Sequence, residues 1–465
     1  TVWLPECSYR EMTEWVLPAE KQLACVQARV AATTDPALAN IATFIRGGTW
    51  RNFRNRYPEA NEMYARMLAV SGRIERLRQA DTTDPAALAE ATQALYRGQC
   101  NCAYWHGAFG GIYLPHLRNA IFHELIAAEK AADRAEGRLG AWVEATTADY
   151  DFDGRTDIRL SSESLDAWIA PAKGGMLYEL DLRDQEHNLL ATLDRRPEAY
   201  HEQVLAGPGV ARSVVDASQL AKFKQEGLER MVRYDTSRRK SLVDHFWDVG
   251  VESAAVVEGT ALERGDFASG SYEASIRRNP GRIQVLLSRT GNAWGIPFTL
   301  SKAITLEAGA RALEIAYKLE GLPRDFRQHL AIEFNFAGLP AQAAGRFFYD
   351  DSGRPLGDLG SRLDLEGPRA LGLVDDWLDI DARLTFAPAS NGAATGIWTF
   401  PIQSVSQSEG GFELVHQSVV VMPHWIVTPD ADGIWKVTMR LDLGRYSNRG
   451  TAAADRLVAV TSRTG

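Results

Sequence analysis

The spacing of apolar residues changes at about residue 140, and this change constrains the fold more than any other feature of the sequence. Before it, apolar residues recur at helical intervals, as along one side of the segment 111–136. After it, short segments such as "RIQVLLSRTG", "LEIAYKLEGL" and "WKVTMRLDLG" alternate between apolar and polar residues and are separated by turn residues. The pattern predicts an α+β multidomain chain, in which a helical segment precedes a large antiparallel β-sandwich.

A helix-start signal occurs twice in the helical part. The segments "TTDPALANIATFI" and "TTDPAALAEATQALY" both place Thr-Thr-Asp before a proline. An aspartate can accept hydrogen bonds from the free N–H groups of a first helical turn, and proline suits the first helical position. We therefore expect helices to begin at Pro36 and Pro85.

Charge and composition exclude several classes of protein. The 465 residues carry a net charge of −9, which argues against a nucleic-acid-binding protein, because such proteins normally present a basic face. No apolar run approaches the roughly 20 residues of a membrane-spanning helix, and no signal peptide is visible. Four cysteines in a chain of this length do not make a disulfide framework, so the sequence predicts a cytoplasmic protein.

The stretch "RGQCNCAYWHGAFGGIYLPHLRNA" suggests two kinds of site. Cys100 and Cys102 raise the question of a metal or redox site, but structural zinc usually needs four ligands and redox pairs favour Cys-x-x-Cys. We therefore interpret both as small buried thiols. The aromatic residues could instead form a surface that stacks on sugar rings, although core packing is the default explanation of their spacing. These residues are Tyr104, Trp105, His106, Phe109 and Tyr113.

The segment "DYDFDGRTD" resembles the first half of a calcium loop. Calcium prefers several carboxylate and carbonyl oxygens, and a glycine permits the sharp turn. An EF-hand would place glutamate at the twelfth position, where this chain has Leu160, so the segment is not an EF-hand. A looser calcium site and an exposed acidic turn both remain open. The candidate ligands are Asp149, Asp151, Asp153 and Asp157.

The segment "LAIEFNFAGL" predicts a strand with two different faces. Leu330, Ile332, Phe334 and Phe336 share one face, and Glu333 lies with Asn335 on the other. A carboxylate beside an amide could bind a sugar, but a solvated outer face is the simpler expectation. The sequence has no G-x-S-x-G elbow, P-loop, dinucleotide fingerprint or H-E-x-x-H motif to indicate another chemistry.

Several long segments together resemble glycoside hydrolase family 57, in its α-amylase and 4-α-glucanotransferase branch. The stretch "QCNCAYWHGAFGGIYLPHLRNAI" is similar to the fifth characteristic region of that family. "SYREMTEWVLP" and "FIRGGTWRNFRNRYPEANEMYARML" resemble the end of its catalytic region. "YDFDGRTDIRLSSESLDAWIAPAKGGMLYELDLRD", "LDRRPEAYHE" and "IWTFPIQSVSQSEGGFELVHQS" resemble its carboxyl-terminal β-sandwich. The matches follow one another in order along nearly the whole chain.

The resemblance implies a division of the chain into three parts. Residues 1–52 would be the tail of an incomplete (β/α)₇ catalytic barrel, and residues 53–138 a helical segment lining the active site. Residues 139–465 would form a β-sandwich similar to that of galactose mutarotase. Members of the family act on α-1,4-glucans with retention, and related enzymes often dimerise, so a homodimer is open.

The resemblance also implies where the chemistry lies. A Glu nucleophile and an Asp acid/base, about 5–5.5 Å apart, form and resolve a glycosyl-enzyme. Both would lie upstream of Thr1, so this chain contains no catalytic residue of its own and would be inactive alone. The opening "TVWLP" resembles the end of a buried strand, and we expect residue 1 to lie inside a longer protein. No cofactor is required. The implied substrate-side residues are Tyr104, Trp105, His106, Trp15, Trp50 and Arg51.

One departure from the family pattern keeps alternatives open. The family usually has Asn-Asp before the aromatic pair, whereas this chain has Asn101 and Cys102. A thiol cannot replace a carboxylate as an acceptor for sugar hydroxyls. The chain could therefore belong to an inactive homologue that binds glucan or acts as a scaffold. A third alternative is an enzyme with shifted chemistry that uses a sandwich carboxylate such as Glu333.

Overall fold

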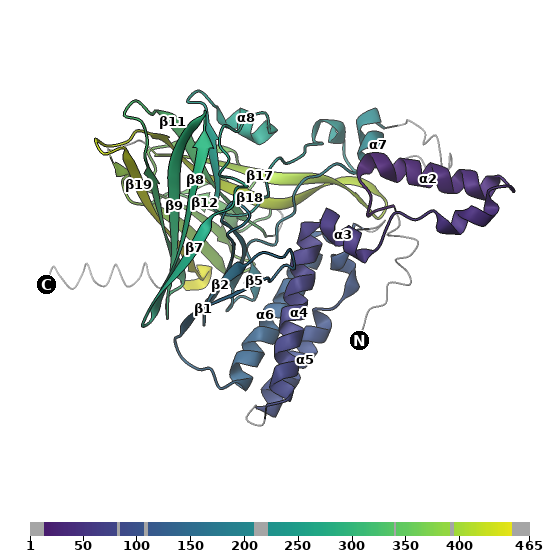
Figure 1. Cartoon of the computed structure of the whole chain (residues 1–465), viewed down its shortest axis with the longest axis horizontal. Coiled ribbons are helices and arrows are strands. Elements are labelled where there is room, and N and C mark those ends of the chain that lie inside the picture. Colours follow the sequence, from purple (N-terminus) through teal and green to yellow (C-terminus); the bar gives the residue numbers. More distant parts are fainter. Residues whose placement is uncertain are drawn as a thin grey trace.

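The computed structural model describes residues 14–80, 84–106, 110–208, 222–338, 341–390 and 395–448. Helices come first along the chain, and three antiparallel sheets follow them (Figure 1). The predicted fold class, a helical segment followed by a large antiparallel β-sandwich, is confirmed. The opening "TVWLP" and the side chain of Phe109 lie outside the described residues.

The helical segment is built around two long helices, α4 and α6, which run in the same direction and each begin with proline. Their inner faces pack with α5 around a core that includes Met63, Ile74 and Leu125. The helices of this part are α2 (Ala19–Thr34), η1 (Ala39–Phe44), α3 (Trp50–Arg56), α4 (Pro58–Arg78), α5 (Pro85–Arg97), η2 (Asn101–Tyr104), η3 (Gly111–Tyr113) and α6 (Pro115–Ala135).

One of the two predicted helix starts is confirmed, and the other is wrong. Asp84 precedes α5, and its Oδ1 atom accepts the N–H groups of Ala86 and Ala87 at 2.9 and 3.2 Å. Asp35 accepts the N–H of Ala37 at 2.8 Å, but only a turn and the 3₁₀-helix η1 follow. No residue of η1 is buried. A short helix without tertiary burial is marginal, which explains why the capping signal alone did not produce an α-helix here.

Three antiparallel sheets make up the rest of the fold. The amino-terminal sheet has the order β1-β2-β3-β4-β5, with β1 (Val143–Ala148), β2 (Asp157–Ser162), β3 (Leu165–Ala170), β4 (Met176–Leu182) and β5 (His187–Asn188). The nine-stranded sheet has the order β13 (Pro355–Asp358), β12 (Arg346–Tyr349), β15 (Ala370–Asp375), β16 (Ile380–Phe386), β19 (Ile434–Gly444), β10 (Ala312–Glu320), β9 (Ile296–Glu307), β8 (Arg282–Ala293) and β7 (Glu273–Asn279).

The third sheet, which we call the β11 sheet, packs against the nine-stranded sheet. Its order is β14 (Leu363–Glu366), β17 (Thr395–Ser408), β18 (Gly411–Val427), β11 (Gln328–Phe336) and β6 (Val243–Trp247). Short helices α7 (His201–Ala206), η4 (Leu228–Arg230), α8 (Ser253–Glu258) and η6 (Tyr446–Asn448) lie in the connections. The long β17–β18 hairpin extends beyond the sandwich towards α7 and α2 (Figure 1).

The two faces of β11 show how far strand alternation predicts burial. Leu330, Ile332 and Phe334 point into the core between the sheets, as expected. The expectation of a solvated outer face is wrong, because Glu333 and Asn335 are both 0% exposed. Polar groups from the chain before β6 cover them: Asn335 donates to the carbonyl oxygen of Lys240, and a guanidinium binds Glu333.

A buried ionic network joins the helical segment to the amino-terminal sheet. Arg66 of α4 donates to Glu129 of α6 at 2.6 Å and to Glu179 and Asp181 of β4 at 2.8 and 3.1 Å. The guanidinium of Arg66 also lies 4.8 Å from the ring centre of Trp168. Charges buried this deeply are stable only when they are paired, so the network fixes the helices against the sheet.

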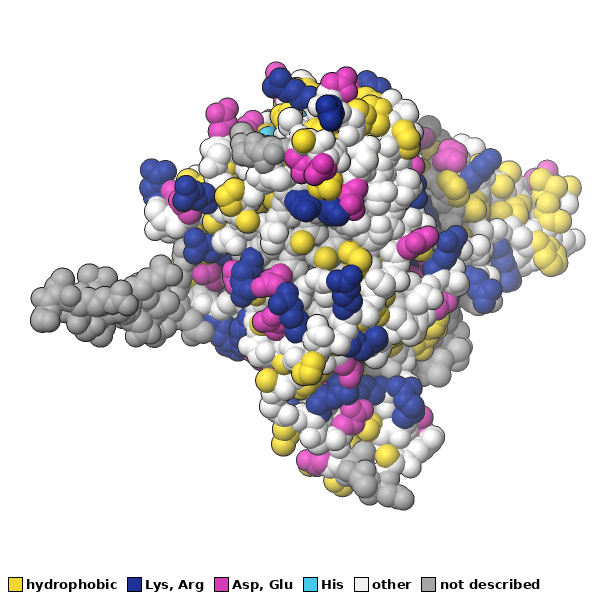
Figure 2. Space-filling model, turned by 60° about the vertical axis from the view of Figure 1, so that its left-hand side comes forward, with side chains coloured by type: hydrophobic (Ala, Val, Ile, Leu, Met, Phe, Trp, Pro, Cys, Tyr) yellow, Lys and Arg dark blue, Asp and Glu magenta, His cyan; other side chains and the backbone are white. Residues whose placement is uncertain are grey.

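The surface of the sandwich mixes charges of both signs. Figure 2 shows Lys and Arg side chains interleaved with Asp and Glu side chains over one face of the molecule. On the nine-stranded sheet, for example, Glu314 pairs with Arg282 and Arg440. Within the described ranges, none of the helices combines the length and apolar character that crossing a bilayer requires.

The predicted boundary between residues 52 and 53 falls inside α3, which runs from Trp50 to Arg56. The helix begins with a capping box, in which the side chains of Thr49 and Asn52 bind each other's backbone. A break at residue 52 would cut this helix, and a division at residue 49 would keep it whole. The three-part division itself remains a prediction.

Candidate functional site

The loop that carries Trp105 is fixed at both sides. On one side, Tyr104 is 5% exposed and its hydroxyl donates to the carbonyl oxygen of Gly98 at 2.7 Å. On the other, Ile112 donates its N–H to the carbonyl oxygen of Trp105 at 2.8 Å. Gly111 makes this approach possible, since a Cβ there would lie 2.1 Å from that oxygen and φ is +49°. Hydrogen bonds therefore hold the backbone at the half-buried Trp105 and at Tyr104 before it.

His106 lies in an aromatic cage directly behind this loop. Its ring centre is 4.4 Å from that of Trp15, 4.7 Å from Tyr113 and 5.8 Å from Tyr200. The residue is 0% exposed, and neither ring nitrogen has a hydrogen-bond partner among the described residues. Burial, together with the positive charge of Arg56, lowers the pKa of His106 to about 3, so the imidazole is neutral.

Glu198 forms the polar centre of the same cage. The hydroxyls of Tyr57 and Tyr113 both donate to its Oε1 atom at 2.7 Å, and Arg56 donates to its Oε2 atom at 2.6 Å. Burial raises the pKa of Glu198 despite the neighbouring Arg56. The residues come from α3, η3 and the segment before α7, so the cage joins the helical segment to the sandwich.

Sequence reasoning did not single out Glu198, although it lies in the quoted segment "LDRRPEAYHE". The only local sign of a polar site is that Glu198 follows two arginines and precedes Tyr200 and His201. Its partners Tyr57 and Tyr113 lie 141 and 85 residues away along the chain, so no local spacing could reveal the cage.

The remaining predicted site residues lie near this cage. Trp15, Trp50 and Trp105 are all half-buried and pack on the core of the helical segment. Trp50 stacks on Phe53 at 5.3 Å between ring centres, and Arg51 beside it is exposed. Trp15 thus contacts the cage directly and Trp50 connects to it through Phe53 and Tyr57, whereas Tyr104 and His106 are buried.

The two neighbouring cysteines are exposed, and the prediction that both are buried is wrong. The Cys102 thiol lies 3.5 Å from the side-chain oxygen of Asn101. Partial burial and the nearby Cys100 raise the pKa of Cys102, which favours the neutral thiol. Within the described ranges, one group of side chains lies close enough together to share a metal ion, namely Asp149, Asp151 and Asp153. It contains neither cysteine.

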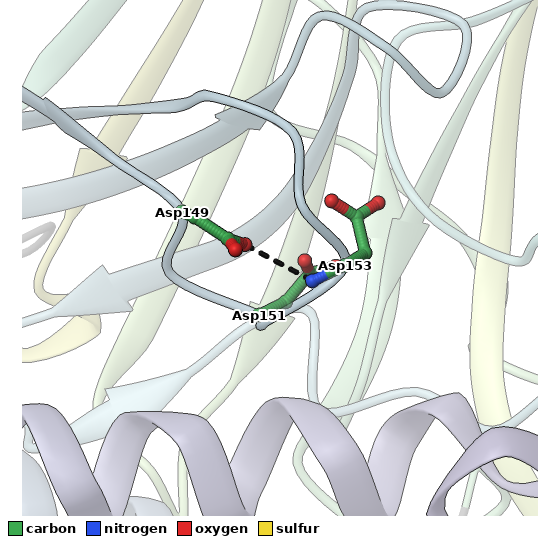
Figure 3. Close-up of side chains that lie close together, drawn as sticks. All are labelled: Asp149, Asp151 and Asp153. Carbon is green, nitrogen blue, oxygen red and sulfur yellow. Dashed lines mark hydrogen bonds between the residues drawn. The ribbon is translucent and has the colours of Figure 1, made fainter.

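The acidic loop between β1 and β2 gathers three of its four predicted ligands (Figure 3). Carboxylate oxygens of Asp149, Asp151 and Asp153 lie within 4.8 Å of one another. Asp149 also accepts the N–H of Asp153 at 3.0 Å. The Lys173 ammonium binds Asp151 and lies 2.9 Å from Asp153, so it already neutralises part of the cluster.

Asp157 stands apart from that group, at the first residue of β2. It is 2% exposed, and its carboxyl accepts the N–H of Tyr150 at 3.2 Å. Burial and the negative charge of Asp151 raise the pKa of Asp157 to about 7. A carboxyl group that holds a proton near neutral pH is a poor ligand for calcium.

Comparison with known protein families gives two matches. The family model described as "Alpha-amylase/4-alpha-glucanotransferase, middle domain" matches residues 48–132. The model described as "Alpha-amylase/4-alpha-glucanotransferase, C-terminal" matches residues 149–439. The two matches follow one another in chain order and cover both the helical segment and the sandwich.

Individual proteins and a crystal structure are similar over almost the whole chain. "Alpha-amylase 1" of Dictyoglomus thermophilum is 29% identical over 94% of this chain and 60% of its own. A 4-alpha-glucanotransferase of Thermococcus kodakarensis is 31% identical over 90% of this chain and 56% of its own. The crystal structure of the Thermococcus litoralis 4-alpha-glucanotransferase superposes with a TM-score of 0.72 at 28% identity. The superposition covers 94% of this chain and 58% of the Thermococcus litoralis chain. This chain therefore spans less than two thirds of the length of these relatives.

Proposed function

The chain belongs to the α-amylase/4-α-glucanotransferase family, and we propose that it forms the carboxyl-terminal part of an enzyme that processes α-1,4-glucans with retention. The observation that carries the proposal is the ordered match of both family models, over residues 48–132 and 149–439. The nucleophilic Glu and the acid/base Asp belong, in this proposal, to an upstream segment. The chain alone supplies substrate contacts and no catalytic carboxylate.

An exposed apolar surface supports the proposal of a further segment. The arm formed by α2 and η1 projects from the molecule (Figure 1) and leaves Phe44 80% and Ile41 48% exposed. Apolar side chains gathered on one projecting element favour a packing partner over contact with water. We assign this arm to contact with the catalytic segment, whether that segment is part of one longer chain or a separate one. A homodimer contact is the alternative use of the surface.

Trp105 is the substrate-side residue with the strongest geometric support. It is half-buried and its carbonyl oxygen accepts the N–H of Ile112, so its ring can stack on a sugar from an anchored backbone position. We assign Trp15, Trp50 and Arg51 to the same cleft, since Trp15 contacts the cage and Trp50, next to Arg51, connects to it through Phe53 and Tyr57. Tyr104 and His106 are buried, and a direct bond from either to a sugar would require a different side-chain position; we assign them to holding Trp105.

Replacing Trp105 with alanine in the full-length protein should lower kcat/KM on maltooligosaccharides. Loss of one stacking contact costs about 0.5–1.5 kcal/mol, which is roughly a two- to tenfold decrease. Activity assays and melting curves of both proteins give the comparison. Trp377→Ala is the matched control, because Trp377 is 78% exposed at the β15–β16 turn. Equal kcat/KM values for the Trp105 variant and the unaltered enzyme would remove this assignment.

The alternative function is a homologue without catalysis that binds glucan or acts as a scaffold. Cys102 favours it, because a neutral thiol stands where the family has a carboxylate. A full-length protein that binds maltooligosaccharides but neither cleaves nor transfers them would support this alternative. In either case we place the protein in the cytoplasm, where free thiols such as those of Cys25, Cys100 and Cys102 are stable.

We further assign the acidic loop to a structural calcium site, formed by Asp149, Asp151 and Asp153 after the ammonium of Lys173 moves away. Millimolar Ca²⁺ should then raise the melting temperature by about 1–3 °C, since a ligand bound only to the folded state stabilises it. The Asp149→Asn variant keeps a hydrogen-bond acceptor and should lose this response. Equal shifts in both proteins would show that Ca²⁺ acts elsewhere.

A further inference from the structure

A cavity of about 580 Å³ opens on the outer face of the β11 sheet, and neither Trp105 nor another residue of its loop lines it. Its floor includes His245 and Trp247 of β6 and Glu333 of β11. The walls come from residues 235–239, from the segment after α8, and from Arg56 and Pro58 of the helical segment. Its size is within the usual range for small-molecule sites. The proposed function does not use this cavity.

The floor holds a charged imidazole between two carboxylates. The Nδ1 atom of His245 lies 2.8 Å from Glu263, and its Nε2 atom lies 3.3 Å from Glu333. Burial disfavours the imidazolium, but these two hydrogen bonds outweigh burial and raise the pKa of His245 to about 9. The ring of Trp247 stacks on this imidazole, 5.0 Å away and tilted by 14°. Trp247 is 4% exposed and also stacks on Trp398, 6.2 Å between ring centres, so it supports the imidazole from beneath and the floor presents a fixed polar group.

The walls consist of arginine–carboxylate pairs. Arg239 donates to both oxygens of Glu333 at 3.1 and 3.0 Å and to Asp235 at 2.7 Å. Arg195 donates to the same oxygen of Asp235 at 2.6 Å. Arg196 binds Glu59 behind the wall and leaves one guanidinium nitrogen, Nη1, without a partner among the described residues. Such pairs are rigid and offer donors beside acceptors.

The balance of charge favours a neutral, polar ligand. The lining has six Lys or Arg residues and four Asp or Glu residues. Carboxylates outside the lining neutralise the excess positive charge: Glu59 binds Arg196, Glu198 binds Arg56 and Asp151 binds Lys173. A free anion would have to compete with these carboxylates. An apolar ligand would leave the arginine and carboxylate groups without partners, which is costly.

We propose that this cavity is a second carbohydrate site, which binds one or two hexose units at the end of an oligosaccharide. The sugar hydroxyls exchange hydrogen bonds with the lining groups that are partly exposed, namely the carboxylate of Glu263 and the guanidinium groups of Arg238 and Arg196. The identity of the hexose as glucose rests on the proposed function. The site binds and does not catalyse: Glu333 is buried, and Arg239, His245 and Asn335 lower its pKa against the effect of burial, which makes it a weak base.

The proposal is tested by titrating the 465-residue chain with maltose and maltotriose by isothermal calorimetry. The chain carries Trp105→Ala, which removes the main contact proposed for the other site, and the cavity variants below then report which binding depends on this cavity. The exposed Thr236 and Ser269 line the cavity, and the single variants Thr236→Trp and Ser269→Trp would fill it without removing any pair described above. Each should weaken binding about tenfold or more. Leu262→Trp is the matched control, because Leu262 is 61% exposed and lies outside the lining, and it should leave the affinity unchanged.

Two results would overturn the inference. One is the absence of maltose binding, or binding that neither blocking variant weakens. The other is binding of inorganic phosphate that displaces the sugar and is itself lost on blocking, which would make the cavity an anion site. These outcomes are independent of the proposed function, since no turnover is measured. An inert full-length enzyme would refute that function without touching this site.

Discussion

Replacement of Asp244 by alanine should lower the free energy of unfolding by about 3–5 kcal/mol, because it leaves a buried ammonium without its counter-ion. Asp244 lies on β6 and is 0% exposed. One of its oxygens accepts Lys302 Nζ at 2.8 Å and the hydroxyl of Tyr272 at 3.0 Å, and the other accepts the hydroxyl of Tyr317 at 2.8 Å. All four side chains meet between the two sheets of the sandwich.

The loss extends beyond one ion pair. Lys302 also donates to the carbonyl oxygens of Gly174 and Leu242 at 2.8 and 2.7 Å, so its nitrogen cannot move out to water without breaking these bonds. Burial lowers the pKa of Lys302, and Asp244 opposes that effect. Without Asp244 the ammonium would lose its proton more readily. The double variant Asp244→Ala with Lys302→Met removes both charges and should recover much of the lost stability.

Urea unfolding at pH 7 measures these differences. Asp248→Ala is the control, because Asp248 directly follows β6, is 51% exposed, and pairs with Arg264 at the surface. Exposed pairs contribute about 0–1 kcal/mol, so this variant should unfold close to the unaltered protein. An Asp244→Ala midpoint that coincides with the Asp248→Ala midpoint would show that the buried pair contributes little.

The parts of the fold that sequence could predict are those set by local spacing. The cap formed by Asp84 and the inward side chains of β11 follow from neighbouring residues, and both are confirmed. The covering of Glu333 and Asn335 could not be predicted in this way. The groups that cover them come from residues about 95 positions earlier in the chain, and alternation shows only that a face is polar, not whether another segment lies on it.

The same limit applies to the candidate sites. The aromatic loop at Trp105 was found because its residues are contiguous. The cage around Glu198 joins residues from three separate segments, and the cavity at His245 joins still more. A capping signal at Asp35 failed for the opposite reason, since local chemistry was correct but no core was present to stabilise a helix.

Acidification should destabilise this fold through its buried and half-buried histidines. Five of the nine histidines have pKa values lowered to about 3 or 4, mainly by burial, namely His106, His201, His329, His416 and His424. In the unfolded chain each binds a proton near pH 6.5. Between about pH 6.5 and 4 the unfolded state therefore binds more protons than the folded state, and stability falls as pH falls.

Buried carboxyl groups act in the opposite direction over part of this range. The pKa of Asp157 is raised to about 7 and that of Asp194 to about 6, chiefly by burial. These groups bind protons more tightly in the folded state, so they stabilise the fold as pH falls from about 7 to 4. The net slope of stability against pH is a sum of both effects, and a single histidine is best tested by the change in that slope.

His416 offers the clearest test. It is half-buried and lines a small, mostly apolar cavity with Leu189, Phe336 and Asp375, and its Nδ1 atom has no partner among the described residues. The His416→Leu variant should lose less stability between pH 7 and pH 4 than the unaltered protein, by about 3 kcal/mol, because one proton-binding group is absent from the unfolded state. Urea unfolding at pH 7, 6, 5 and 4 gives the slope for each protein.

His116→Leu is the control, since His116 is exposed on α6 and remains in contact with water in the folded state. Parallel slopes for the His416 variant and the unaltered protein would mean that His416 already takes up its proton in the folded state, and that burial in this cavity does not keep it neutral.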